Sequence, residues 1–156
     1  MAIQFYSTRG EHGGFSNFSR HRVWLDGASW PTSEHYFQAQ KFAGTPHAER
    51  IRRAKSPGEA AQLGRTRDLP LRADWEAVKD DVMRRVVLAK FEQHATLAEV
   101  LLATGDAPLV EHTARDAYWG DGGDGTGRNM LGRILEETRA RLRAALGDPP
   151  TSAPPR

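Results

Sequence analysis

Residues 74–93 read DWEAVKDDVMRRVVLAKFEQ and carry the longest helical pattern in the chain. Their apolar side chains recur at spacings of three and four, which indicates a helix with one buried face. That face consists of Trp75, Val78, Val82, Val86 and Ala89. Asp74 precedes the first apolar position and is predicted to cap the helix, because a short carboxylate can accept hydrogen bonds from free N–H groups there. The strongest pattern in the sequence is therefore helical.

Shorter elements are predicted on both sides of this helix. Pro46 and Pro57 suit the first turn of a helix, where the missing N–H of proline costs little, and Thr32 or Ser33 can cap another. The predicted helices cover residues 33–43, 46–55, 57–65, 97–103 and 129–146, and the predicted extended segments cover residues 3–6, 22–25 and 108–112.

These elements predict a mainly α fold. We expect a single compact α-rich domain over residues 1–146, with a few short β-strands near the N-terminus. The proline-rich residues 147–156 are too polar to bury anything and are predicted to form a disordered tail.

Length and composition narrow the class of protein. The chain has 156 residues, enough for one domain, of which 38% are hydrophobic and 27% are charged. It contains no run of about 18 apolar residues, the length that a membrane span needs. Its first residues also lack the apolar core of a secretory signal. We therefore expect a cytoplasmic protein that does not engage a membrane.

The residue types present also limit the chemistry. Cysteine is absent, which excludes disulfides, thiolate nucleophiles, iron–sulfur clusters and thiolate zinc sites. The six histidines show no HExxH pairing, and the sequence predicts neither a metal nor a cofactor. Residues 50–72 hold seven basic and two acidic side chains. Such an excess can face phosphate groups or form a solvated helix surface.

The first segment with chemical content is residues 33–42, SEHYFQAQKF. On a helix Glu34, Gln38 and Lys41 share one face, because they stand at positions i, i+4 and i+7. This stripe faces solvent or forms the polar floor of a pocket. In a pocket, desolvation would raise the pKa of the carboxyl and lower that of the amine, which suits proton transfer and nucleophilic attack. The nearby aromatic residues that would form its walls are Phe15, Phe18 and Trp30.

The second segment is residues 116–129, DAYWGDGGDGTGRN, which lead directly into a predicted helix. Glycines let backbone N–H groups approach an anion, and the helix N-terminus and Arg128 add positive charge. The segment is neither a Walker A loop nor a dinucleotide-binding fingerprint, and its aspartates lack the spacing of a calcium loop. Trp119 can stack on a base or pack in the core. Together the two segments suggest a phosphorylated, nucleotide-like ligand and leave the reaction open.

Three motifs resemble the signatures of the NADAR family. They are GFSNF at residues 14–18, WPTSEHYFQAQKF at residues 30–42 and DAYWGDGGDGTGRNMLG at residues 116–132, and the resemblance covers about residues 3–146. It implies an α-rich fold and an N-glycosidase. One bacterial branch cleaves reactive ribosylamine intermediates of early riboflavin synthesis, a metabolite-damage role. Other branches remove ADP-ribose from guanine bases in nucleic acid.

The resemblance also suggests site residues. The family pattern D-x-x-W-G-x-G, closed by N-x-L-G, falls on Asp116, Trp119, Gly120, Gly122 and Asn129, while Asp121 occupies a free position. The candidate catalytic residues are Glu34, Lys41 and Asp116. The candidate substrate-binding residues are Asn17, Gln38, Trp119, Gly120, Gly122, Gly123, Arg128 and Asn129.

Two chemical routes and three functions remain open on the sequence. A carboxylate, Glu34 or Asp116, can stabilise an oxocarbenium-like sugar and activate water. Alternatively, Lys41 can form a Schiff base with the opened ribose. The partner is a small phosphorylated ribosylamine in the first function and ADP-ribosylated DNA in the second. The third function is a nucleotide-binding sensor without turnover.

Overall fold

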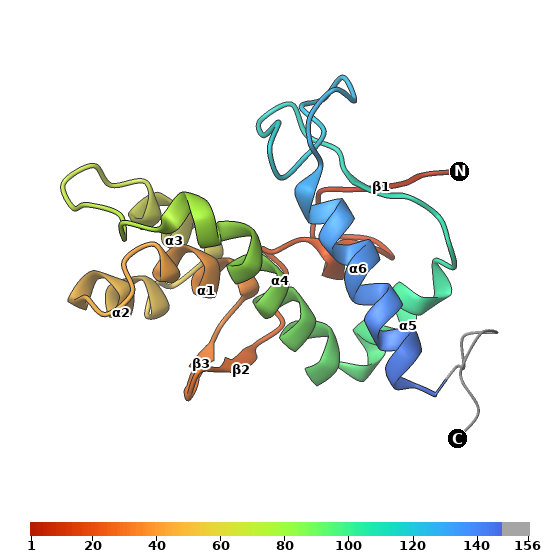
Figure 1. The fold of residues 1–156 in the computed structure, drawn as a ribbon, viewed down its shortest axis with the longest axis horizontal. Coiled ribbons are helices and arrows are strands. Elements are labelled where there is room, and N and C mark those ends of the chain that lie inside the picture. Colours follow the sequence, from red (N-terminus) through yellow and green to blue (C-terminus); the bar gives the residue numbers. More distant parts are fainter. Residues whose placement is uncertain (148–156) are drawn as a thin grey trace.

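The computed structural model describes residues 1–147 (Figure 1). Of the predicted tail, residues 148–156 lie outside the described part. The helices of the described part are α1 (Ser33–Gln40), α2 (Pro46–Arg52), α3 (Pro57–Gly64), α4 (Trp75–Gln93), α5 (Ala95–Ala103) and α6 (Met130–Ala145), with a 3-10 turn at Gly13–Phe15. The strands are β1 (Ile3–Phe5), β2 (Val23–Leu25), β3 (Ala28–Trp30) and β4 (Leu109–Glu111). The prediction of a mainly α domain with a few short strands is confirmed.

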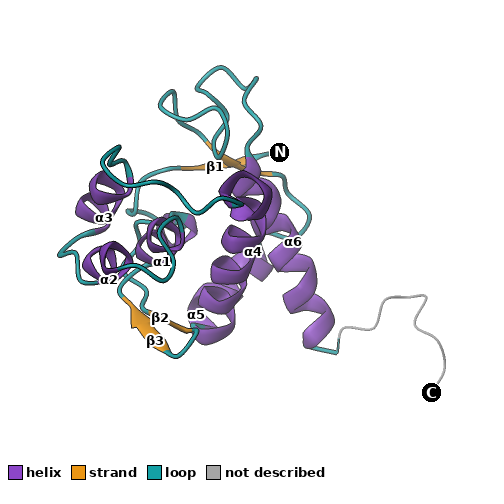
Figure 2. Ribbon diagram, turned by 60° about the vertical axis from the view of Figure 1, so that its left-hand side comes forward, coloured by secondary structure: helices purple, strands orange, loops and turns teal. Residues whose placement is uncertain are grey.

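Helix α4 runs through the middle of the molecule. Figure 1 shows α1, α2 and α3 on one side of it and α5 and α6 on the other, and in Figure 2 α1, α2 and α3 again lie together on one side of α4, with α6 on the other. Contacts join α4 to α1, α5 and α6, and α1 also packs against α2 and α3. Because α1 lies between α4 and α3, its side chains can meet residues from both.

The strands form two separate pairs. β2 and β3 make an antiparallel hairpin whose turn residues, Asp26 and Gly27, both have positive φ, as a two-residue hairpin of this hand requires. Strand β3 was not predicted, since residues 26–30 lack a clear alternation. β1 pairs with β4 in parallel, in the register Ile3 with Leu109. Strand β4 therefore sits beside the N-terminus in space, although it is distant in sequence.

Hydroxyl caps explain where three helices begin. Thr32 accepts a hydrogen bond from the N–H of His35, Thr45 from that of Ala48, and Ser56 from that of Glu59. The prediction for Asp74 is wrong in one respect. Asp74 occupies the N-cap position of α4, yet its carboxylate makes no capping bond and instead accepts from the Arg72 guanidinium, at 2.6 and 3.0 Å.

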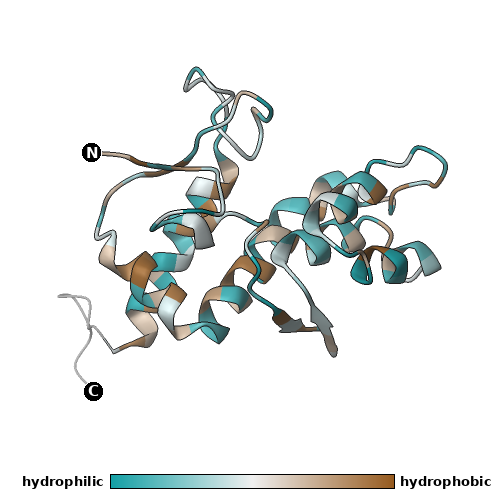
Figure 3. Cartoon of the chain, turned by 180° about the vertical axis from the view of Figure 1, so that it is seen from behind, coloured by the Kyte–Doolittle hydropathy of each residue, from teal (hydrophilic) through white to brown (hydrophobic). Residues whose placement is uncertain are grey.

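The core lies between α4 and its neighbours. All five inward positions predicted for the last helix are buried, namely Leu131, Ile134, Leu135, Thr138 and Leu142. In α4 the buried face is broader than predicted, because the helix is covered on several sides. Met83 and Val87 are buried there, whereas Val78 and Val82 are only half-buried. Figure 3 shows apolar and polar positions alternating around the helices, as one-sided burial requires.

One buried position of α4 holds a lysine, a residue that carries a positive charge when it is exposed to water at neutral pH. Lys90 is 1% exposed, and its Nζ donates one hydrogen bond, of 2.9 Å, to the carbonyl of Ser16. Burial lowers the pKa of Lys90 to about 7. Lys90 in turn contributes to the lowered pKa of His21, whose main cause is burial. The lysine fastens the segment around Ser16 to α4 at a cost in desolvation.

This burial predicts a pH-dependent stability. Between pH 7 and about 10 the unfolded chain holds the Lys90 proton and the folded chain does not, so the free energy of unfolding rises with pH by up to about 1.4 kcal/mol per unit. Lys90→Met lacks this dependence, and its stability relative to wild type is greatest near pH 6.5. Urea unfolding from pH 6.5 to 9.5 measures the difference. Lys55→Met, at an exposed position, is the control, and parallel curves for wild type and Lys90→Met would contradict the expectation.

Candidate active site

A cavity of about 650 Å³ opens between helices α1, α3 and α4 and the chain at the ends of strands β1 and β4. Four segments provide most of its lining: residues 6–8 after β1, residues 16–18, helix α1 and residues 111–119. The volume falls in the range of small-molecule sites. Six of the eleven predicted site residues line it, namely Asn17, Glu34, Gln38, Lys41, Asp116 and Trp119.

The floor of the cavity is the predicted stripe of α1. Gln38 Nε2 donates to Glu34 Oε2 at 2.7 Å, one helical turn away. Lys41, directly after the helix, directs its Nζ toward the carbonyl of Gly64 at 3.5 Å and lies 5.9 Å from the centre of the Phe37 ring. The stripe therefore faces a pocket rather than open solvent.

Desolvation shifts the two ionisable groups of this floor in opposite directions. Burial raises the pKa of Glu34, and the charge of Asp116 raises it further, while the Gln38 hydrogen bond and Lys41 oppose the shift. Burial also lowers the pKa of Lys41, with Arg65 and Lys79 adding to the effect and Glu34 opposing it. These are the directions that favour proton transfer at Glu34 and nucleophilic behaviour at Lys41.

Gln38 leaves one atom without a partner. The side chain is 8% exposed, and its buried Oε1 accepts no hydrogen bond from the described residues. Gly64 lies directly against it, since a Cβ there would approach Oε1 to 2.0 Å. The absence of a side chain at Gly64 is thus what lets the Gln38 amide lie beside Glu34.

Asn17 positions Glu34 from the other side. The main-chain carbonyl of Asn17 accepts from the Glu34 N–H at 3.1 Å, and its Oδ1 accepts from the Ser33 hydroxyl at 2.8 Å. Its Nδ2 lies 3.4 Å from the sulfur of Met83 on α4. The first turn of α1 is therefore tied to the segment that Lys90 fastens to α4.

Asp116 and Trp119 form the opposite wall. Asp116 Oδ1 accepts from the N–H groups of Tyr118 and Trp119, at 2.9 and 2.8 Å. These bonds occupy one carboxylate oxygen and fix the turn. Trp119 packs its ring against Phe37, with centroids 5.2 Å apart and planes at 83°. The tryptophan thus belongs partly to the core and partly to the pocket.

The aromatic walls differ from those expected. Phe18, Phe37 and Trp119 line the cavity, and Phe37 was not among the aromatic residues expected there. Phe15, 1% exposed, and Trp30, 7% exposed, are core residues. Trp30 is held there because its Nε1–H donates to the carbonyl of Leu25 within the hairpin, at 3.0 Å.

Residues 120–129, the glycine-rich loop in which an anion cradle was expected, do not line the cavity. Several N–H groups of this loop donate to the protein itself, for example that of Gly122 to the Asp116 carbonyl and that of Gly127 to the Asp121 carbonyl. Asp121, 4% exposed, accepts from the N–H of Thr113 at 3.0 Å and of Gly123 at 2.8 Å, and its other oxygen meets His112 Nδ1 at 2.7 Å. The His112 hydrogen bond and these N–H groups lower the pKa of Asp121 to about 2. The Asp121 carboxylate thus accepts hydrogen bonds from two main-chain N–H groups and from His112.

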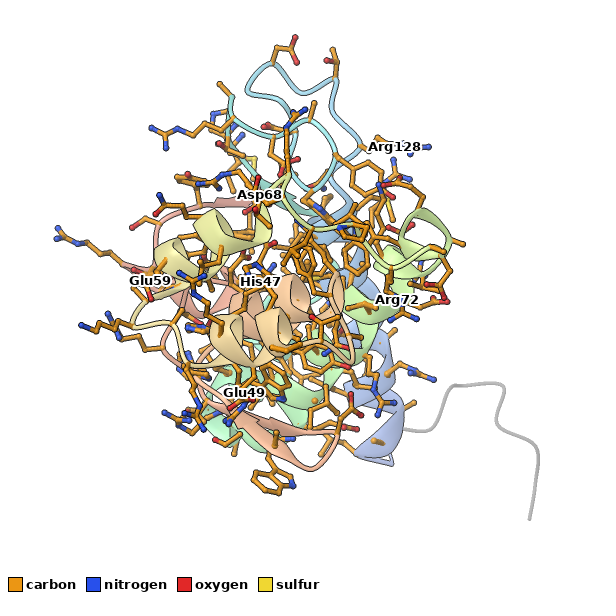
Figure 4. All side chains as sticks on the ribbon, turned by 90° about the vertical axis from the view of Figure 1, so that its left-hand side faces the viewer. His47, Glu49, Glu59, Asp68, Arg72 and Arg128 are labelled. Carbon is orange, nitrogen blue, oxygen red and sulfur yellow. The ribbon has the colours of Figure 1, made fainter. Side chains whose placement is uncertain are left out.

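The remaining predicted binding residues of this loop have structural contacts. Arg128 stacks on Tyr118, with its guanidinium 5.3 Å from the ring centre, and Figure 4 shows it at the edge of the molecule. Gly122 and Gly123 adopt positive φ in the turn. Gly120 is enclosed, since a Cβ there would lie 2.9 Å from the carbonyl of Glu111.

Asn129 is also a structural residue of this loop. It has a φ of 53°, and its amide accepts from the Glu111 N–H and donates to the Leu109 carbonyl, both at 2.9 Å. Its side chain therefore supports β4 rather than lining the cavity.

The basic run divides between the surface and the cavity. Arg52 and Arg53 pair with Glu49, and Arg72 with Asp74, on the outer side of the helical layer where Figure 4 labels Glu49 and Arg72. Arg65, at the end of α3, lines the cavity instead. Charge count alone could not single out this residue.

Three charged lining residues were missed by the sequence reasoning: Arg65, Glu111 and Arg115. Burial raises the pKa of Glu111 to about 7, and the charges of Asp116, Glu34 and Asp121 add to the shift. Glu111 lies within the predicted extended segment 108–112 and is the last residue of β4, and the ends of strands are frequent places for functional residues. Its place in a predicted extended segment was the feature of the sequence that could have indicated a functional role.

A NADAR domain model matches residues 4–143. The chain belongs to the NADAR family. It is 58% identical over 140 residues to N-glycosidase YbiA of Escherichia coli K12, covering 90% of this chain and 88% of that protein. It is 46% identical over 149 residues to N-glycosidase Npun_R5314 of Nostoc punctiforme, covering 94% and 96% of the two chains.

Two further comparisons extend this family assignment. The Vibrio vulnificus riboflavin biosynthesis protein VVA0006 is 46% identical over 90% of this chain, which spans 38% of that protein. The NMR structure of E. coli YbiA superposes with a TM-score of 0.88 at 53% identity, covering 97% of this chain and 90% of that one. The family resemblance and the fold predicted from it are confirmed.

No helix within residues 1–147 combines the length and apolarity needed to cross a membrane. No group of three or more histidine or acidic residues in the same part is arranged to hold a metal ion.

The contact between Gly64 and Gln38 predicts a matched pair of variants. In Gly64→Ala the new methyl group displaces the flexible Gln38 amide from Glu34 while the fold is retained. We expect N-glycosidase turnover to fall about 10- to 100-fold, because a hydrogen bond to a charged group contributes roughly 1.5–3 kcal/mol. Gly58→Ala, on the same helix, meets only Ser56 Oγ at 3.8 Å and retains turnover. Equal turnover in both variants, with unchanged circular dichroism, would contradict this role of Gly64.

Proposed function

We propose that this chain, a hydrolase of N-glycosyl bonds like its named relatives, cleaves the C1′–N bond of small phosphorylated ribosylamines. The substrates would be the reactive ribosylaminopyrimidine phosphates of early riboflavin synthesis, removed before they cause damage. The observation that carries the proposal is the composition of the cavity. Glu34, Lys41 and Asp116 line it together with two arginines, Arg65 and Arg115.

The arginines suit the phosphate of such a substrate. Both are exposed, and within the described residues neither forms an ion pair. A guanidinium can donate two parallel hydrogen bonds to phosphate oxygens. The phosphate would stay near solvent at these residues, while the ribose reaches the half-buried Glu34 and Asp116.

The carboxylates suit the reaction at C1′. Breaking the C–N bond leaves positive charge on the sugar, which a nearby carboxylate stabilises. Water then adds to C1′ and gives its proton to the same carboxylate. Glu34 and Asp116 both reach the cavity, and each is held by hydrogen bonds, from Gln38 in one case and from the turn N–H groups in the other.

Lys41 offers the second route. As a neutral amine it would add to C1′ of the opened ribose and expel the leaving amine, which takes the proton, so that a Schiff base forms. Water then hydrolyses the C=N bond, releasing ribose phosphate and restoring the amine. The lowered pKa of Lys41 supports this role.

A second candidate function is removal of ADP-ribose from guanine in DNA. A further cavity of about 550 Å³ shares Thr8 and Phe18 with the first and includes Arg20 and His21. An extended ligand such as ADP-ribose would fill both cavities, whereas a ribosylaminopyrimidine phosphate would fill one.

The function is tested by offering both substrates to the purified protein. We expect release of ribose 5-phosphate and free aminopyrimidine from the ribosylaminopyrimidine phosphate. Chromatography of the reaction mixture measures both products. Release of ADP-ribose from a modified guanine oligonucleotide alone would favour the second candidate. Binding of ADP-ribose without release of any product would favour a sensor and overturn the proposal.

The phosphate contact gives a prediction for the arginines. Arg65→Ala and Arg115→Ala should raise KM for phosphorylated substrate about 10- to 100-fold, and leave KM for the dephosphorylated form nearly unchanged. Arg67→Ala, an exposed neighbour in the same basic run, is the control. Arg128→Ala tests the sequence-based prediction, and its distance from the cavity predicts no phosphate-specific effect. An equal rise in KM for both substrate forms would contradict the role of Arg65 and Arg115.

Borohydride trapping separates the two chemical routes. If Lys41 forms a Schiff base, reduction during turnover adds the sugar phosphate to the intact mass, and peptide mapping places it on Lys41. Lys41→Arg is then inactive, because arginine keeps the charge and loses the nucleophile. Substantial turnover by Lys41→Arg, with no adduct in wild type, would leave the carboxylate–water route.

A further inference from the structure

We propose that Glu111 is the general acid that protonates the leaving nitrogen, a role that rests on the proposed function. Glu111 stands at the end of β4, its carboxyl group has no hydrogen-bond partner within residues 1–147, and charged side chains line the cavity around it.

The main chain of Glu111 is held from several directions. Its N–H donates to Asn129 Oδ1 at 2.9 Å, and its carbonyl accepts from the N–H of Asp121 at 2.9 Å. It pairs with Phe5 across the parallel β1–β4 ladder. A backbone fixed in this way gives the side chain a defined origin at the cavity wall, which an acid needs for proton transfer over hydrogen-bond distance.

The carboxyl group itself is unpartnered. Within the described residues it makes no hydrogen bond or ion pair, and it lines the cavity in a half-buried position. Glu34 differs, because its carboxylate accepts from Gln38, and Asp116 differs, because it accepts from two N–H groups. Donors to a carboxylate stabilise its ionised form. Among the three, Glu111 is therefore the one best suited to carry a proton.

The surrounding charges act in the same direction. The charges of Glu34 on α1 and of Asp116 and Asp121 in the loop after β4 all raise the pKa of Glu111, because an ionised Glu111 would add a further negative charge near them. The positive groups in the same cavity are Lys41 after α1, Arg65 after α3 and Arg115 in the loop. The net effect, led by burial, is a pKa of about 7 for Glu111. At neutral pH a substantial fraction of the protein then holds the acid in its protonated form.

The step balances without a co-reactant. As the C1′–N bond breaks, its electron pair goes to nitrogen, which takes the proton of Glu111 and leaves as a neutral amine. Water forms the new C1′–O bond and gives a proton to Glu34 or Asp116. That proton returns to Glu111 through solvent, so the products are the free amine and the ribose phosphate.

Kinetics against pH test this assignment. In wild type kcat should fall as pH rises through about 7, because Glu111 loses its proton. Glu111→Gln should lower kcat at least 100-fold and abolish this fall of kcat at alkaline pH, which we call the alkaline limb. Glu111→Asp should restore part of the kcat and part of the alkaline limb. Glu34→Gln should lower kcat and keep the limb. Glu99→Gln, an exposed carboxyl on α5, is the inert control.

Several outcomes would overturn the assignment while leaving the proposed function in place. One is a Glu111→Gln enzyme that keeps the alkaline limb. Another is a Glu111→Gln enzyme whose KM alone rises, which would make Glu111 a ribose anchor.

A titration that needs no substrate separates the two proposals. The side-chain carboxyl carbons of glutamate are labelled with ¹³C, and the Glu111 resonance is assigned as the one missing from Glu111→Gln. We expect it to titrate near pH 7. Titration near the ordinary value of about 4.3 overturns the acid assignment whether or not a ribosylamine is cleaved. Absence of any turnover by wild type instead overturns the proposed function.

Discussion

The amide of Asn129 holds the wall of the cavity together. It accepts from the Glu111 N–H and donates to the Leu109 carbonyl, and so closes the open edge of β4 on the start of α6. Gly132 makes this approach feasible, since a Cβ there would lie 2.0 Å from the Leu109 carbonyl. The positive φ of Asn129 turns the chain into α6 at this point. The family motif N-x-L-G thus has a structural meaning: it fixes the strand end from which Glu111 reaches the cavity.

The site contains ionisable groups whose burial costs desolvation free energy. Glu34 and Lys41 are displaced from their ordinary pKa values mainly by burial, and the interaction between them recovers only part of the desolvation. Lys90 is a further case, because its burial is offset by a single hydrogen bond to Ser16. Buried ionisable groups contribute little net stability. Their concentration at the segments that line one cavity points to a function for that cavity.

Local chemistry made much of the fold predictable. Helix α4 has the predicted bounds, and Thr45 and Ser56 cap the helices that their prolines open. The shared face of Glu34, Gln38 and Lys41 followed from helical spacing and lies in the cavity. The binding role of the glycine loop stays a prediction, because whether its N–H groups are free depends on where Asp121 points, and periodicity carries no such information. Glu111 was missed for a related reason: the acidic residues that raise its pKa lie 5 to 77 positions away in the sequence.

The basic and acidic side chains of the cavity differ in exposure. Arg65 and Arg115 are exposed, whereas Glu34 and Glu111 are half-buried. A phosphate keeps part of its hydration at such an arginine rim, while C1′ must reach the carboxylates for its bond to nitrogen to break. Under the proposed function the phosphate of the ligand contacts the arginines and its C1′ contacts the carboxylates, whereas a free base or a free phosphate would make only one of these two sets of contacts. The contacts that position the ligand are thus separate from those that strengthen as charge develops on the sugar. Binding energy at the arginines can therefore orient C1′ toward the carboxyl groups that take part in the reaction.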